Sequence, residues 1–383
     1  MQSPSHPSRA NSFTFLRLVL ALAVVFGHSF PLGGFGSDPF YWLCGGRLAI
    51  HELALQCFFI LSGYLLMGSL ALQPSLGRFA LRRCFRIFPG YWVALLVAAL
   101  GVAPAVIAHL YPGRFSYGAS LVAGEIDAAH YLARNALLWA GQVAIPPLFY
   151  GNPMVGIVNG SLWTIFYEAL CYAALALAAA CGVLRRRNLV LGLFAALYLP
   201  SVVHAVLPFP VVSFATEWER IFSIAFHPAG PNLALPFAAG VAAHFLLRGR
   251  PAWNPRWCCI ALAAFAVSLP LGAGRVFGPL VLPYLLISLG EKLPFQKWER
   301  VGDFSYGIYI YAFLIQQSLT QYGVNRRGYA AYLAASLALS IVAGVLSWFL
   351  IERPAIRLGG RLLAWIGAGA GTPARGLPAP ATA

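Results

Sequence analysis

The chain has 383 residues, of which 60% are hydrophobic and 10% are charged, and its net charge is +15. Soluble domains carry about 25% charged residues, so this composition excludes a soluble globular protein and indicates a polytopic membrane protein. The positive charge does not indicate a nucleic-acid partner, because the basic residues follow the loops between apolar segments. The seven cysteines show neither a disulfide pattern nor metal-ligand spacing, so we expect no metal.

Apolar windows of about 20 residues predict an all-α integral membrane protein with about ten transmembrane helices. No short apolar segment with a cleavage site precedes residue 11, so the first window is expected to be a retained helix rather than a signal peptide. Residues 110–160 contain one further segment, near His130, that is polar at its start and is expected to be interfacial. The predicted spans are 13–31, 49–70, 88–109, 161–183, 189–208, 232–247, 257–273, 277–290, 304–322 and 329–351.

The distribution of basic residues predicts the orientation of the chain. With the N-terminus in the cytoplasm, eighteen Lys and Arg fall in cytoplasmic loops and tails and seven fall on the opposite side. This asymmetry satisfies the positive-inside rule, and an even number of spans places both termini in the cytoplasm. We expect residues 1–10 to form an N-terminal tail, 11–357 the membrane domain, and 358–383 a disordered C-terminal tail rich in Gly, Ala and Pro.

The first predicted span carries Arg17 near its start and His28 near its end. At ~100° and ~1.5 Å per residue, the two side chains share one face of a helix and lie roughly 16 Å apart. Ionisable residues inside a membrane helix usually face protein or water and mark a functional site. The alternative is a histidine near the interface that hydrogen-bonds to a neighbouring helix.

Two features follow along the chain. Ser62 and Gly63 lie in the second span, where small residues allow either close helix packing or the passage of a slender substrate. Arg82, Arg83 and Arg86 precede the third span, and helical spacing would place them together. Such a cluster either anchors the loop to anionic lipid or binds a phosphorylated ligand through bidentate hydrogen bonds.

The fourth span contains Glu168, a carboxylate well inside a predicted membrane helix. An unpaired charge there would cost at least a few kcal/mol. We therefore expect Glu168 to be neutral, to pair with a cation such as Arg17, or to border a polar cavity. Asn159, Ser161 and Trp163 lie at the start of this span and are candidates for lining an outer opening.

The ninth span has a polar stripe that begins with Tyr306 and Tyr309 and continues to Gln316 and Gln317. Tyrosines of an interfacial aromatic belt would explain the first two residues but not the glutamines. After the tenth span, Pro354 is expected to end the helix at the cytoplasmic face.

The sequence resembles the membrane-bound acyltransferase family three, because six short motifs occur in it in the order typical of that family. Bacterial members of the family include O-acetyltransferases of surface glycans. The resemblance covers residues 11 to 357. It implies an acyl-CoA donor, usually acetyl-CoA, that binds from the cytoplasm and an acceptor hydroxyl at the other face. It also implies that His28 is essential and that Arg82, Arg83 and Arg86 hold the donor. The motifs are LRLVLALAVVFGH, FFILSGYLL, RRCFRIFP, NGSLWTIFYEALCY, SYGIYIY and IERP.

The sequence departs from the commonest pattern of that family at three positions. Thr14 and Gln56 stand where many members have Asp, and Ala312 stands where many have a second histidine. No extracytoplasmic hydrolase-like domain is fused to the membrane domain, which leaves a separate periplasmic partner open.

We therefore predict a membrane O-acyltransferase of the bacterial inner membrane that moves an acyl group, most simply acetyl, from cytosolic acyl-CoA to a hydroxyl of a surface glycan. His28 would act as a general base or as a nucleophile, with Arg17 and Glu168 in the same site. The alternative is a transporter or flippase for a glycan or lipid-linked precursor that uses Arg17 and Glu168 as a gating or proton-relay pair. A structural membrane protein would leave these ionisable residues unexplained.

Overall fold

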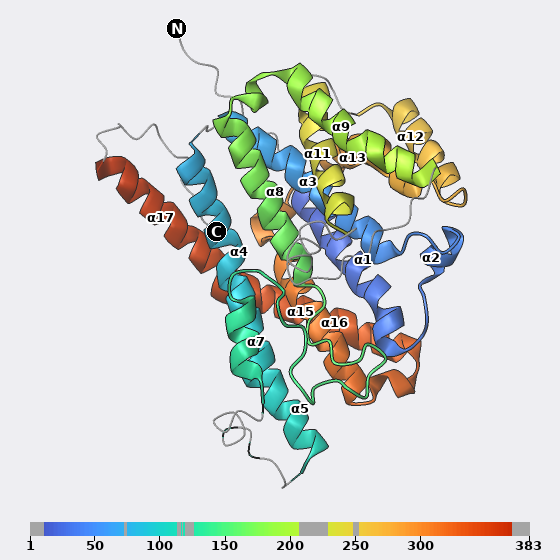
Figure 1. The fold of residues 1–383 in the computed structure, drawn as a ribbon, viewed down its shortest axis with the longest axis vertical. Coiled ribbons are helices and arrows are strands. Elements are labelled where there is room, and N and C mark those ends of the chain that lie inside the picture. Colours follow the sequence, from blue (N-terminus) through green and yellow to red (C-terminus); the bar gives the residue numbers. More distant parts are fainter. Residues whose placement is uncertain are drawn as a thin grey trace, which may run out of the picture.

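The computed structural model describes residues 11–72, 75–112, 116, 118, 126–206, 229–247 and 253–369. Every regular element in these ranges is a helix, so the predicted all-α fold is confirmed (Figure 1). Neighbouring helices pack against one another and enclose a common interior. The function of the molecule therefore depends on which side chains these helices direct into their common interior.

The centre of the bundle consists of α1 (Phe13–Gly33), which packs against both α3 (Ile50–Leu72) and α15 (Ser305–Gln321). Gly27 allows the close approach of α3, because a Cβ there would lie 2.7 Å from Ile50 Cγ2. On the other side, the buried amide of Gln316 donates a 2.8 Å hydrogen bond to the carbonyl of Val25. The short α2 (Pro39–Leu43) lies between α1 and α3 in the chain.

The third helix begins earlier than the predicted span of 88–109. It runs as α4 (Leu76–Leu96), continues through a π-helical turn (Val97–Val102) and ends as α5 (Ala103–Leu110). Arg82, Arg83 and Arg86 therefore lie inside this helix and not in a loop before it. A hydropathy window misses these first turns because the arginines lower its average, although Phe79 and Ile87 on the same turns are buried.

Five helices form the middle of the chain: α8 (Trp163–Ala180), α9 (Arg187–Val206), α11 (Ala229–Leu247), α12 (Pro255–Ser268) and α13 (Gly274–Lys292). A 3-10 turn, Val183–Arg185, links the first two. Among these, α11 packs closely along α3. A Cβ at Gly63 would overlap the carbonyl of Phe237, and a Cβ at Gly240 would overlap the carbonyl of Ile60. Paired glycines thus bring the two backbones into contact, as in other membrane helix pairs.

The C-terminal part contains α14 (Trp298–Val301), α15, a 3-10 turn (Val324–Arg327) and α16 (Tyr329–Ser347). A π-helical turn, Trp348–Glu352, leads directly into α17 (Arg353–Gly369). The expectation that Pro354 ends the helix is wrong, because the π-helical turn before it passes into α17 without a break. Residues 358–369, expected as the start of a disordered tail, are helical, and residues 370–383 lie outside the described part.

Between α5 and α8 the chain forms α7 (Ala128–Asn135) and an irregular segment, 136–162. This segment is fastened to the end of α15. Asn152 donates to the Oε1 atom of Gln317 at 2.8 Å, and Gln317 donates to the carbonyls of Met154 and Ile157 at 2.8 and 2.7 Å. The second glutamine of the predicted polar stripe is therefore a structural bridge to this segment.

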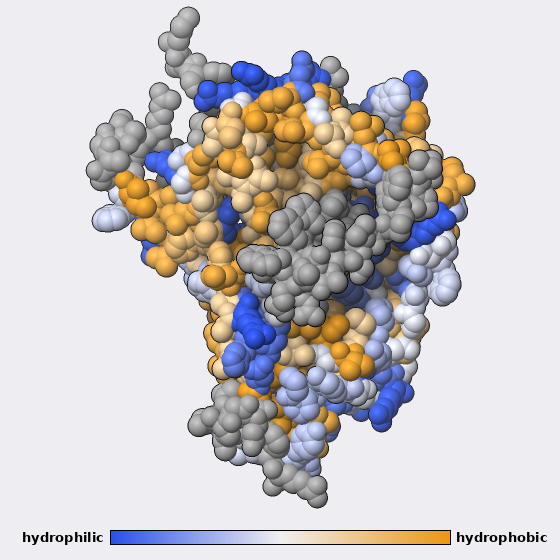
Figure 2. All heavy atoms as spheres, in the orientation of Figure 1, coloured by the Kyte–Doolittle hydropathy of each residue, from blue (hydrophilic) through white to orange (hydrophobic). Residues whose placement is uncertain are grey.

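Five helical stretches in the described ranges are long and apolar enough to cross a membrane: Phe13–Gly33, Ile50–Leu72, Leu76–Leu110, Trp163–Ala180 and Tyr329–Ile366. Helices are present at all ten predicted spans, although the others are shorter or less apolar by the same measure. On the face in Figure 2, hydrophobic residues cover much of the upper part, below hydrophilic residues along the top edge. These features are those of a membrane protein.

Candidate functional site

A pocket with charged walls lies between α1, α3, α4, α8 and α15. It contains about 840 Å³ of empty space, including its open mouth. Apolar and polar side chains share its lining, and the charged ones are placed where water is partly excluded and electrostatic interactions are strong. The predicted site residues that it brings together are Arg17, Ser62, Arg83, Arg86, Glu168, Tyr306 and Tyr309.

Four charged residues form one ion-pair network beside this pocket. Asp303 Oδ2 lies 3.0 Å from Arg17 Nη1 and 2.8 Å from Arg86 Nη2, and Arg86 Nη1 lies 2.5 Å from Glu352 Oε2. Burial alone would raise the pKa of Asp303, but the two guanidinium groups outweigh it and lower that pKa below its usual value. The predicted pairing of Arg17 with Glu168 is therefore wrong, because Arg17 pairs with Asp303 instead.

The network also fixes the role of Arg86. Both of its terminal nitrogens are bonded to carboxylates, and its guanidinium lies 5.3 Å from the Tyr306 ring centroid and 5.7 Å from that of Trp348. Its side chain is only 14% exposed. Arg86 therefore holds α4 to the start of α15 and to the turn before α17, and its charge is already neutralised.

Arg83 has a different environment, although it is only three residues away. It lines the pocket and forms no ion pair with any residue in the described ranges. Its guanidinium lies about 6 Å from the ring centroids of Phe79 and Tyr172, and its buried Nε atom lacks a hydrogen-bond partner. Arg83 thus combines a pocket position with a guanidinium group that no carboxylate in the described ranges contacts directly.

Glu168 lines the same pocket and accepts a hydrogen bond from the hydroxyl of Tyr172, one turn further along α8. Ser62 on α3 in turn donates to the Tyr172 hydroxyl at 3.3 Å. Glu168 was expected to be neutral, to pair with a cation or to border a polar cavity. The structure shows the third arrangement, because its carboxyl group lines the pocket. Ser62, Tyr172 and Glu168 connect α3 with α8 across the wall that also carries Arg83.

His28 lies on α1 beyond the described lining of the pocket. Its ring and that of Phe313 meet in a T-shaped arrangement, with ring centroids 5.6 Å apart and planes at 80°. Phe313 is one helical turn after Tyr309, which lines the pocket and shares a 2.6 Å hydrogen bond with Thr164. The histidine is therefore separated from the pocket by about one turn of α15.

Several predicted site residues do not line this pocket. Gly63 packs against α11, and Gln316 bonds to α1, so both have structural roles. Asn159 donates to the carbonyl of Ile310 at 2.8 Å and thereby fixes the segment before α8. Arg82, Ser161 and Trp163 also lie outside the lining; Ser161 is buried, whereas Trp163 is 36% exposed.

Sequence reasoning missed the partners of the charged residues. Asp303 and Glu352 neutralise Arg86, Tyr172 bonds to Glu168, and His51 lies beside His28. A usable signal existed for three of them, since Asp303 lies two residues before the SYGIYIY motif, Tyr172 ends the NGSLWTIFYEALCY motif and Glu352 belongs to IERP. The described residues contain no group of three His, Cys, Asp or Glu that could hold a metal ion.

An all-helical fold with long apolar helices and an interior pocket lined by arginines defines a polytopic membrane protein with an internal site. Comparison with known families is more specific. Residues 11–351 match the acyltransferase 3 family, described as an acyltransferase domain, and the chain belongs to this family. The protein is therefore an acyltransferase.

Two curated relatives match along nearly their whole lengths. Nodulation protein 10 of Rhizobium leguminosarum bv. viciae is 27% identical over 380 residues, which cover 92% of this chain and 95% of the relative. An O-acetyl transferase of Shigella phage Sf6 is 25% identical over 363 residues, 90% of this chain and 96% of the relative. No solved structure gave a significant match.

Proposed function

We propose that the protein transfers an acyl group, most simply acetyl, from an acyl-CoA to a hydroxyl group of a glycan. The family and the name of the phage relative support O-acyl transfer. The identity of the donor and the acceptor is our proposal. It rests on the site, which offers a cationic position for a phosphorylated donor and a histidine close to it.

The observation that carries this proposal is the environment of Arg83. An arginine that lines a pocket without an ion-pair partner is available to a ligand anion. Its planar guanidinium suits the phosphates of CoA, which accept paired hydrogen bonds. Arg17 and Arg86 border the same pocket, but both are paired with Asp303, and Arg86 is also paired with Glu352, so carboxylates already offset their charges.

The chemical step is assigned to His28. The oxygen of the acceptor hydroxyl bonds to the acyl carbon, the carbon–sulfur bond breaks, and CoA leaves as a thiolate. As a general base, the imidazole would take the hydroxyl proton and return it to the thiolate. As a nucleophile, it would first carry the acyl group itself and then pass it to the hydroxyl.

We place the protein in the bacterial inner membrane with ten spans and both termini in the cytoplasm. In that orientation Arg83 lies toward the cytoplasm, where acyl-CoA is found, and His28 lies toward the outer face. The excess of basic residues in the predicted cytoplasmic loops supports this orientation.

The test uses purified full-length protein, [14C]acetyl-CoA and surface polysaccharide from a strain that lacks the protein. Wild type should label the polysaccharide and release CoA, whereas His28→Ala and His28→Gln should retain less than about a hundredth of that activity. His130→Gln, on the exposed α7, is the matched control and should be fully active.

Two results would overturn the proposal: labelling by His28→Gln at more than about a tenth of the wild-type rate, or movement of a glycan with the donor left intact. The second would favour a transporter. No observation in the structure favours that function, because the Arg17–Glu168 pair on which it depended does not form.

A further inference from the structure

A second histidine lies against the candidate catalytic one. The rings of His28 on α1 and His51 on α3 have centroids 4.4 Å apart, and their planes meet at 36°. In each ring the Nδ1 atom is buried without a hydrogen-bond partner. Both residues as a whole are only partly buried. Buried polar atoms in proteins usually form hydrogen bonds. Packing between α1 and α3 alone therefore does not explain two imidazole rings in contact, each with an Nδ1 atom that forms none.

The local structure brings these two rings together. Gly27, next to His28, has no side chain, and a Cβ there would lie 2.9 Å from His51 N and 3.0 Å from His51 Cβ. Phe313 closes another side of the His28 ring. Any residue larger than glycine at position 27 would push the first turn of α3 away and separate the pair.

Charged groups near His51 are already engaged by other parts of the protein. Glu52 bonds to Arg275 at 3.0 Å and accepts a hydrogen bond from the backbone N–H of Ala49. Asp38 caps α2 by accepting from the backbone N–H of Tyr41 at 3.0 Å. Within the described ranges, neither carboxylate bonds to His51, so the immediate neighbour of its ring is the other imidazole.

The histidine pair is also close to the pocket. Leu55, one turn after His51 on α3, lines the pocket, as does Tyr309, one turn before Phe313 on α15. Measured along α3 and along α15, the histidine pair thus lies about one helical turn beyond the pocket. A donor whose phosphates meet Arg83 would extend its thioester toward these rings.

We propose that His51 is a second proton-transfer residue of the reaction, which shares with His28 the proton that leaves the acceptor hydroxyl. This inference rests on the proposed function. As the hydroxyl oxygen bonds to the acyl carbon, its proton passes to the imidazole pair. The carbon–sulfur bond breaks, and the pair returns the proton to the departing thiolate, so both histidines end the cycle as they began it.

A pair suits this task better than one imidazole. Two neighbouring cations repel each other in a low dielectric, so the pair holds one proton and not two. Once one ring is protonated, the neutral ring beside it disperses part of the charge. The pair therefore behaves as one titrating unit, and removal of either ring should impair the chemical step.

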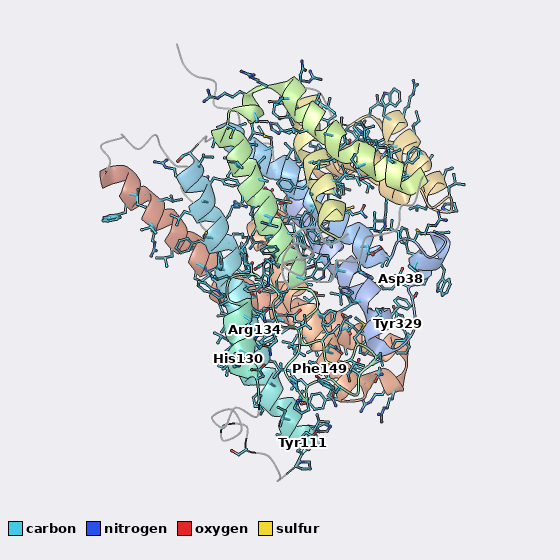
Figure 3. The ribbon with its side chains drawn as sticks, viewed as in Figure 1. Asp38, Tyr111, His130, Arg134, Phe149 and Tyr329 are labelled. Atoms are coloured by element: carbon cyan, nitrogen blue, oxygen red, sulfur yellow. The ribbon has the colours of Figure 1, made fainter. Side chains whose placement is uncertain are left out.

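The test compares His51→Gln and His51→Ala with wild type and with His130→Ala. His130 is exposed on α7 and is paired with Asp127, and Figure 3 shows it on the opposite side of the molecule from Asp38 and Tyr329. We expect both His51 variants to lose about 100-fold in kcat while the KM for acetyl-CoA changes less than about twofold. Added imidazole should restore part of kcat in His51→Ala but not in His28→Ala, and it should leave the kcat of the fully active His130→Ala unchanged.

Two outcomes overturn the inference. One is a kcat per folded molecule of His51→Gln within about threefold of wild type, which assigns His51 a packing role. The other is a rise in the KM for acetyl-CoA at unchanged kcat, which assigns it to donor binding. If His28→Gln is inactive while His51→Gln is active, this inference fails and the proposed function stands. If wild type transfers no acyl group, the proposed function itself fails.

Discussion

At the scale of single residues, three arginines of one segment have three different environments. Arg82 lies outside the pocket lining, Arg83 lines the pocket without an ion pair, and Arg86 bonds to two carboxylates. The sequence predicted the cluster, because helical spacing is a local property. It could not predict that the three arginines have different environments, because Asp303 and Glu352 follow Arg86 by more than 200 residues.

The first prediction separates Arg83 from Arg86. Arg83→Ala should weaken acetyl-CoA binding about ten- to a hundredfold, because a charge-assisted hydrogen bond contributes roughly 1.5–3 kcal/mol. Arg86→Ala leaves the buried Glu352 without its cation and leaves Asp303 paired with Arg17 alone, and breaking a buried ion pair typically costs about 3–5 kcal/mol. We therefore expect a normal yield of folded Arg83→Ala and a strongly reduced yield of Arg86→Ala. Calorimetric titration with acetyl-CoA and size-exclusion yield measure the two effects.

Arg78→Ala is the matched control, because Arg78 is an exposed arginine in the first turn of the same helix. It should change neither donor affinity nor yield. Arg83→Lys should recover only part of the affinity, since an ammonium group cannot form the paired hydrogen bonds of a guanidinium. Full donor affinity in Arg83→Ala would show that this arginine only anchors the helix.

At the scale of helices, the apolar windows located the elements well because membrane helices are defined by long apolar runs. The predicted helix boundaries were wrong where charged residues face the protein interior. The start of α4 was missed because Arg83 and Arg86 face the interior pocket, and α17 was missed because the helix continues past Pro354. Hydropathy measures the composition of a segment and not the direction of its side chains.

The second prediction concerns the contact of α3 with α11. A Cβ at Gly63 would overlap the backbone carbonyl of Phe237, and backbone cannot move aside as a flexible side chain can. We expect Gly63→Ala to separate the two helices and to lower the midpoint of thermal unfolding in detergent. The control is Gly192→Ala in α9, where a Cβ meets nothing within 4 Å and alanine should stabilise the helix by about 0.5–1 kcal/mol. Equal unfolding midpoints for both variants would contradict this account.

At the scale of the whole molecule, the stretch from Tyr329 to Ile366 determines where the C-terminus lies. Its 38 residues are helical, which at ~1.5 Å per residue gives roughly 57 Å, well beyond the ~30 Å hydrocarbon core of a bilayer. Its second part cannot lie in the hydrocarbon, since Arg353, Arg357 and Arg361 follow at intervals of one turn. Opposite them lie the exposed side chains of Leu358, Leu362, Trp365 and Ile366. This pattern is typical of a helix that lies along a membrane surface.

The third prediction follows from this arrangement. In a variant with all seven native cysteines replaced by serine, Arg326→Cys marks the turn before α16, and Arg357→Cys marks α17. If α16 crosses the membrane outward to inward, a membrane-impermeant maleimide should label Arg326→Cys in intact spheroplasts. It should label Arg357→Cys only after permeabilisation, because the basic face of α17 then lies at the cytoplasmic surface, where anionic lipid attracts it. Labelling of both positions in intact spheroplasts would place α17 outside. Arg83, which lies in α4 beside this helix, could then not meet a cytosolic donor, and the orientation on which the proposed chemistry depends would be wrong.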